Sequence, residues 1–158
     1  MIRRLLNWLG TSFHRTQMQV WCTKVDHIVS HPPGSDEGFT PEELEQGRKV
    51  NFERFSTWAI VCEEVLDTTY PRAYFRQVQH ELERRGISGE EYQAMRRFAW
   101  LTAGWLNFEK MLWDWCSLDE DDIRLAIEWQ YTEGWISTEE RERRIQFMER
   151  FAKPQALS

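Results

Sequence analysis

The stretch "GISGEEYQAMRRFAWLTAGWLNFEKMLWDWC", from Gly86 to Cys116, contains the strongest helix signal in the chain. Ser88 suits the N-cap position, and Glu91, three residues later, can close a capping box with it. Beyond this start, apolar residues recur at alternating three- and four-residue spacing, which is typical of a buried helix face: Phe98, Leu101, Trp105, Phe108, Leu112 and Trp115. The stretch therefore predicts a long helix over 89–116.

The opposite side of this predicted helix is not polar. A second row follows it, formed by Trp100, Gly104, Asn107 and Met111, and Leu106 and Trp113 lie between the two rows. A helix that is apolar most of the way round is either central in its fold or in contact with a partner. We therefore expect the helix over 89–116 to be central, packed against a second central helix over 41–69.

Similar signals divide the rest of the chain. Starts are marked by Thr40 before Pro41, by Ser117 or Asp119, and by Ser137. Gly86 and Gly134 suit the position just after a helix end. No segment alternates polar and apolar residues in the manner of a strand. The sequence predicts an all-α compact bundle of about six helices, over 2–29, 41–69, 72–85, 89–116, 119–133 and 138–152.

Two of the helix connections resemble each other. "GWISTEERERRIQFMERFA", from Gly134 to Ala152, is similar to "GISGEEYQAMRRFA", from Gly86 to Ala99. Either the chain contains a duplication, or a glycine stop followed by a serine cap is a good short connection used twice; we favour the second interpretation. A single domain over 1–158 is expected, in which a mobile linker at about 30–39, rich in Pro and Gly, separates the N-terminal helix from the rest.

Composition narrows the function classes. Hydrophobic residues make up 41% of the 158 residues, and nine are Trp, so a well-packed globule is expected. The formal charge of −6, from 26 acidic and 20 basic residues, disfavours binding to a nucleic-acid backbone. The cysteines Cys22, Cys62 and Cys116 are far apart and form no C-x-x-C pair. They indicate reduced thiols and a cytoplasmic protein.

No arrangement of residues indicates catalysis. His27 and His31 have a metal-ligand spacing, but Pro32 disfavours helix at His31. The acidic residues over 114–122 lack the ligand spacing of a calcium loop, and no glycine-rich phosphate loop is present. We expect a protein that is not an enzyme and needs no metal or cofactor.

The leading functional hypothesis rests on the aromatic residues, because the chain has more of them than the predicted core rows use. Trp is a common anchor of protein interfaces. The sequence therefore predicts a tryptophan-rich, non-catalytic interaction module, acting as an adaptor, regulator or subunit, that binds a protein partner or a second copy of itself as a homodimer. The expected contact residues are Trp100, Met111, Trp113, Trp129 and Trp135.

Arginines support an alternative. If they converge on the helices over 72–85 and 89–116, they could contact a nucleic-acid backbone as part of a nucleoprotein complex; pairing with nearby glutamates is the simpler expectation. The residues are Arg72, Arg76, Arg84, Arg85, Arg96 and Arg97. Membrane binding is disfavoured, although weak peripheral contact through Arg3, Arg4 and Trp8 stays open. The N-terminal helix is expected to dock on its own bundle instead.

Overall fold

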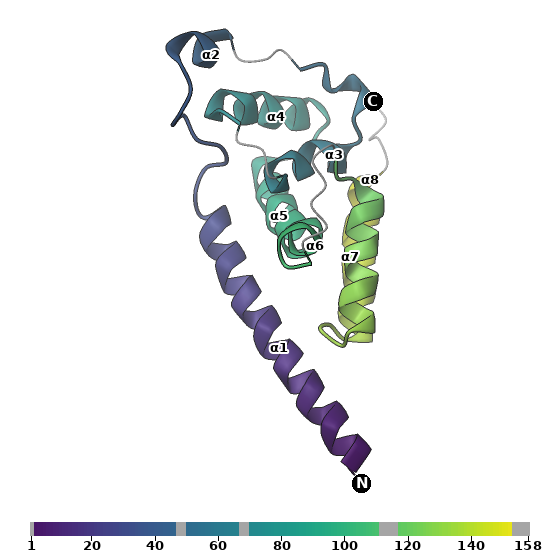
Figure 1. Ribbon diagram of the computed structural model, residues 1–158. Helices are drawn as coiled ribbons and strands as arrows, with labels where there is room; N and C mark the ends of the chain where they lie inside the picture. The colour runs from purple at the N-terminus through teal and green to yellow at the C-terminus, as the bar shows by residue number, and fades with distance from the viewer. Residues whose placement is uncertain (1, 47–49, 67–69, 111–116, 153–158) are drawn as a thin grey trace.

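The computed structural model describes residues 2–46, 50–66, 70–110 and 117–152, with the backbone alone for 2–15, 43, 45 and 46 (Figure 1). All regular structure in these ranges is helical, which confirms the predicted all-α class. The helices are α1 (Ile2–Val29), α2 (Pro41–Gln46), α3 (Thr57–Cys62), α4 (Arg72–Arg84), α5 (Gly89–Ala99), α6 (Trp105–Phe108), α7 (Glu120–Thr132) and α8 (Thr138–Ala152). A π-helical segment, Trp100–Gly104, joins α5 to α6.

Local capping residues set most helix ends where the sequence predicts them. Ser88 and Glu91 form the expected capping box at α5, and Asp119, rather than Ser117, caps α7. The two glycine stops have positive φ angles, 80° at Gly86 and 76° at Gly134. After each glycine, the next backbone N–H donates to a carbonyl five residues earlier. The two similar stretches therefore share one helix-end geometry.

The predicted helix over 41–69 is wrong. In its place are α2, a 3₁₀ turn at Phe52–Arg54, the short helix α3, and a second 3₁₀ turn at Glu63–Val65. The reason is local: Asn51 and Ser56 have extended backbones, and each accepts a hydrogen bond from an amide of the turn it starts. An apolar row of helical spacing runs through this segment, but two caps inside the row interrupt the helix.

The buried centre of the molecule lies along α5, the π-helical segment and α6. This continuous rod contacts α1, α3 and α7, and α8 packs on α7 and α3 (Figure 1). The helix predicted over 89–116 is thus present through Phe108, with a π-helical turn that the sequence does not signal; residues 111–116 lie outside the described ranges. Trp58 on α3 is fully buried, and its indole N–H donates to the carbonyl of Met148 on α8 at 2.8 Å.

The π-helical turn is connected to its neighbours through two backbone carbonyls that accept side-chain hydrogen bonds. Trp21 on α1 donates its indole N–H to the carbonyl of Trp100 at 3.1 Å. Gln130 on α7 donates to the carbonyl of Leu101 at 2.8 Å. A side chain at Gly104 would come within 2.9 Å of the Trp100 ring, so this position favours glycine. Side chains of α1 and α7 thus hold the π-helical turn in place.

Helix α1 packs on the bundle through its C-terminal half. Met18, Trp21 and Val25 are buried there, while the N-terminal turns extend past the other helices (Figure 1). The whole N-terminal helix was expected to dock on the bundle, but only its C-terminal half does so. None of the helices in the described ranges is long and apolar enough to cross a membrane.

The segment after α1 is attached to the start of α4. Ser35 donates its backbone N–H to the carbonyl of Tyr70 at 3.1 Å, and Asp36 accepts from the backbone N–H of Arg72 at 3.0 Å. Gly34, with φ of 80°, lies so close to α4 that an added Cβ would be 2.8 Å from the Phe75 ring. These contacts place residues 30–36 beside α4, where they form one wall of a pocket.

Candidate anion-binding pocket

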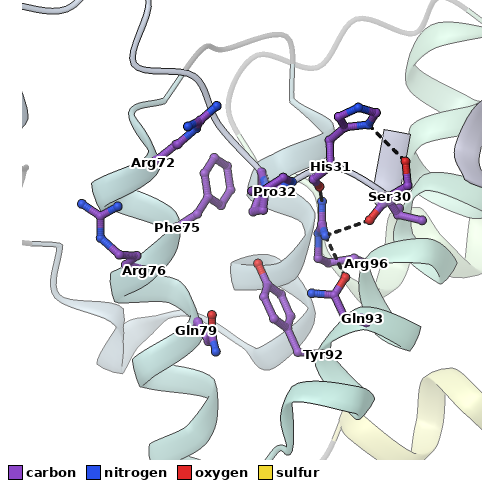
Figure 2. A pocket seen from close by; sticks show the side chains of 12 residues that line it. Ser30, His31, Pro32, Arg72, Phe75, Arg76, Gln79, Tyr92, Gln93 and Arg96 are labelled. Atoms are coloured by element: carbon purple, nitrogen blue, oxygen red, sulfur yellow. Dashed lines mark hydrogen bonds between the residues drawn. The ribbon is translucent and has the colours of Figure 1, made fainter. Parts of the chain in front are cut away.

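A pocket of about 400 Å³ lies between the end of α1, the segment that follows it, α4 and α5 (Figure 2). Helix α4 contributes one wall, and α5 contributes the facing wall. The lining residues are Val29, Ser30, His31, Pro32, Pro33, Arg72, Phe75, Arg76, Gln79, Tyr92, Gln93 and Arg96. Apolar surface from the prolines and Phe75 therefore lies next to amide, hydroxyl and guanidinium groups.

Tyr92 brings a hydroxyl group to this pocket. Its side chain is only 4% exposed, and the hydroxyl has no hydrogen-bond partner in the part of the chain that the structure describes. Figure 2 shows the hydroxyl end directed toward Pro32 and the pocket interior. Burial, and then the nearby Glu64 carboxylate, raise the pKa of Tyr92, so the group stays a neutral donor.

Arg72 and Arg76 lie one turn apart at the α4 edge of the pocket (Figure 2). Both are exposed, and neither guanidinium pairs with a carboxylate of any described residue. The first turn of α4 contains no acidic residue, although Asp36 caps it from the preceding segment. Cations are disfavoured at a helix N-terminus by the helix dipole. These two charges are thus not explained by stabilisation of the fold.

Arg96 has a different role, because every N–H group it has is already bonded. Its guanidinium binds Glu64 at 2.6 and 2.7 Å and Gln93 at 2.8 Å, and it donates to the carbonyls of Val29 and His31 at 3.4 and 3.0 Å. The side chain is 2% exposed. Arg96 therefore holds the end of α1 against α5, and a ligand in the pocket would find no free donor on it.

The other predicted arginines are also paired. Arg84 and Arg85 both bind Glu81, and Arg97 binds Asp26 at 2.7 Å. Arg85 further donates to the carbonyls of Phe52 and Phe55. Four of the six arginines considered for contact with a nucleic-acid backbone are thus in ion pairs with acidic residues, which was the simpler expectation. Only the pair at the pocket keeps its charge available.

The three described residues of the predicted aromatic surface differ in their exposure and contacts. Trp100 stacks on Phe108 with ring centroids 5.5 Å apart, and it donates to Glu64 at 3.2 Å. Trp135 is buried against Trp105. Trp129 is 37% exposed on α7. The two remaining predicted contact residues, Met111 and Trp113, lie outside the described ranges.

The described residues contain no group of three His, Cys, Asp or Glu side chains that could hold a metal ion. The ring of His31 lies at the pocket, with Nδ1 2.9 Å from the carbonyl of His27 and 3.1 Å from the Ser30 hydroxyl. The pocket thus offers donors for an anion and apolar contact for the group that carries it.

One signal for this site was present in the sequence and was missed. Arg84 and Arg85 have Glu81 three and four residues before them, whereas Arg72 and Arg76 have no acid at such spacing within their helix. The role of Tyr92 depends on contacts across the fold, and its sequence position indicates only helix α5. Comparisons of this chain with protein-family models, curated proteins and solved structures found no match. Function is therefore inferred from the geometry of the pocket.

Proposed function

We propose that this protein is a non-catalytic binding module, an adaptor or regulator, that holds an acidic side chain of a protein partner in the pocket between α4 and α5. The observation that carries this proposal is the unpaired state of Arg72 and Arg76 at the α4 edge of a pocket that is also lined by Tyr92, whose hydroxyl has no partner among the described residues. Arg and Tyr are among the residues that most often anchor protein interfaces. The proposal keeps the interaction function expected from the tryptophans but assigns it to a different surface.

The chemistry of the pocket suits a carboxylate attached to an apolar neighbour. Guanidinium groups bind carboxylates through two parallel, charge-assisted hydrogen bonds. Arg72 and Arg76 are exposed, and side-chain rotation on binding would bring them over the pocket mouth. The Tyr92 hydroxyl supplies one more donor, while Phe75 and Pro32 line apolar surface. Electrostatic attraction is stronger beside such surface than in open water.

A nucleic-acid backbone is the weaker alternative. Two unpaired arginines would neutralise few phosphates, and the chain carries a formal charge of −6. Affinity for a backbone rises with the number of phosphates neutralised, so binding would be weak and strongly reduced by salt. The pocket is also bounded on one side by residues 30–33, which suits a side chain better than a continuous strand.

The proposal is tested by NMR titration of the isotopically labelled protein with two blocked dipeptides. The first is acetyl-Glu-Leu-amide, and the second is the neutral control acetyl-Gln-Leu-amide. We expect saturable shifts of Gly34, Gln79 and Gln93 with the acidic peptide and much smaller shifts with the neutral one. Equal shifts with both peptides, or shifts only with an oligonucleotide, would overturn the proposal.

A further inference from the structure

A second feature of the molecule is independent of the pocket: the two halves of α1 have apolar residues on different sides. Met18, Trp21 and Val25 are buried, whereas Val20 is 54% exposed. At about 100° per residue, helix positions 2, 5, 6, 9 and 13 fall within about 60° of position 20. These positions are occupied by Ile2, Leu5, Leu6, Leu9 and Phe13. By register, these positions therefore share the helix face of Val20 and not the face of the buried Met18, Trp21 and Val25.

Charge is distributed just as unevenly. The first 25 residues contain four basic and no acidic residues, while the remaining chain has sixteen basic and 26 acidic residues and a charge of −10. By the same helical register, positions 3, 4 and 15, all arginine, lie about 100° or more from position 20. A basic, amphipathic helix thus extends beyond an acidic bundle (Figure 1).

We infer that the N-terminal half of α1 binds the surface of an anionic lipid membrane. A helix with basic residues on one side and Ile, Leu and Phe on the other lies in the membrane interface, with its apolar row among the acyl chains. The arginines would contact the lipid headgroups, and anionic lipid attracts each such charge. The same anionic surface would repel the acidic bundle. Because the helix projects from the bundle, it can reach the membrane while the bundle stays at a distance.

A second copy of the chain fits this row less well. Two α1 helices paired through it would carry Arg3, Arg4 and Arg15 on both chains and so double the positive charge. Helix pairs are selected by opposite charges beside the apolar seam, and this half of α1 has no acidic residue to offer. Lipid headgroups provide the negative charge that a second helix lacks.

The experiment is sedimentation of the full-length protein with vesicles of phosphatidylcholine alone or mixed with phosphatidylserine. We expect binding to the mixed vesicles, weak binding to the neutral ones, and a strong decrease at high salt. The variant Arg3→Glu/Arg4→Glu should bind the mixed vesicles at least about tenfold less. The matched control, Arg124→Glu/Arg143→Glu, reverses two arginines in exposed ion pairs of α7 and α8 and should bind as the parent does.

Circular dichroism of each variant checks that the fold is retained, and Leu6→Asp/Leu9→Asp tests the apolar row without changing an arginine. This variant should also lose vesicle binding. Absence of binding by the parent protein would overturn the inference, as would equal binding to neutral vesicles or equal losses in both arginine variants. A parent dimer in sedimentation velocity that Leu6→Asp/Leu9→Asp converts to a monomer would assign the row to a second copy instead.

Discussion

The two ends of helix α4 each carry two arginines, and the structure uses them in opposite ways. At the C-terminal end, Arg84 and Arg85 share Glu81, and Arg85 also holds the loop before α3. At the N-terminal end, Arg72 and Arg76 line a pocket without a carboxylate partner among the described residues. The dipole of the helix favours the first arrangement and disfavours the second. Because the described part of the fold does not neutralise Arg72 and Arg76, their charges are available to bind a ligand.

Arg96 extends the comparison, because it resembles the C-terminal pair although it lines the pocket. Both Arg96 and Arg85 bind a glutamate and donate to backbone carbonyls of a distant segment. Arg85 joins α4 to the 3₁₀ turn at Phe52–Arg54, and Arg96 joins α5 to the end of α1. Buried arginines of this kind connect chain segments, and their effect should be seen in stability.

The largest expected loss of stability is that caused by Arg96→Ala. Removal of one partner of a buried ion pair leaves the Glu64 carboxylate without its counter-charge, which costs about 3–5 kcal/mol of unfolding free energy. Urea denaturation measures this loss. The double variant Arg96→Met/Glu64→Met removes both charges and should be more stable than Arg96→Ala. A loss below about 1 kcal/mol would show that Arg96 does not hold these segments together.

A smaller loss is expected for Arg85→Ala. This change leaves the carbonyls of Phe52 and Phe55 without a charged donor and removes a half-buried pair with Glu81. We expect a decrease of about 2 kcal/mol in unfolding free energy, again by urea denaturation. The neighbouring change Arg84→Ala is the control, and it should have little effect because Arg84 is exposed.

Acid should weaken the C-terminal end of α4 selectively. Hydrogen bonds from Arg84 and Arg85 lower the pKa of Glu81 below its ordinary value of 4.5. The stability from this group is present above that value and is lost as pH falls through the lower, folded-state pKa. The stability difference between the parent and Glu81→Gln should therefore shrink at acid pH. A difference that stays constant down to acid pH would contradict this account of the pair.

The smallest stability effect belongs to the pocket. Arg72→Gln/Arg76→Gln removes two cations from the N-terminal half of a helix and no ion pair among the described residues. Stability should stay unchanged or rise by a few tenths of a kcal/mol, measured by urea denaturation. A loss of more than about 1 kcal/mol would show that these arginines support the fold after all.

Prediction from sequence succeeded where a helix end depends on a few adjacent residues. Ser88, Asp119 and the glycine stops place α4, α5, α7 and α8 correctly, because caps act locally. The helix predicted over 41–69 does not form as one element because caps at Asn51 and Ser56 interrupt its apolar row. The π-helical turn depends on side chains of α1 and α7, which no local pattern contains.

The candidate site likewise depends on contacts between residues that are distant in the sequence. The sequence identifies the arginines, but most of their partners are far along the chain: Glu64 is 32 residues from Arg96, and Asp26 is 71 residues from Arg97. Burial of Trp100 and Trp135 likewise follows from packing between helices. Which charged or aromatic residues are left over for a ligand is decided by tertiary contacts, and Tyr92 could be found only there.

The measurement that tests the central claim most directly compares the two ends of α4 in one titration. Acetyl-Glu-Leu-amide is added to the parent protein, to Arg72→Gln/Arg76→Gln and to Arg84→Gln, and NMR shifts at Gly34 and Gln93 are followed. We predict that the first variant loses the shifts at unchanged stability, while Arg84→Gln binds as the parent does. Equal binding by all three proteins would contradict the claim that the unpaired arginines of α4 serve a ligand.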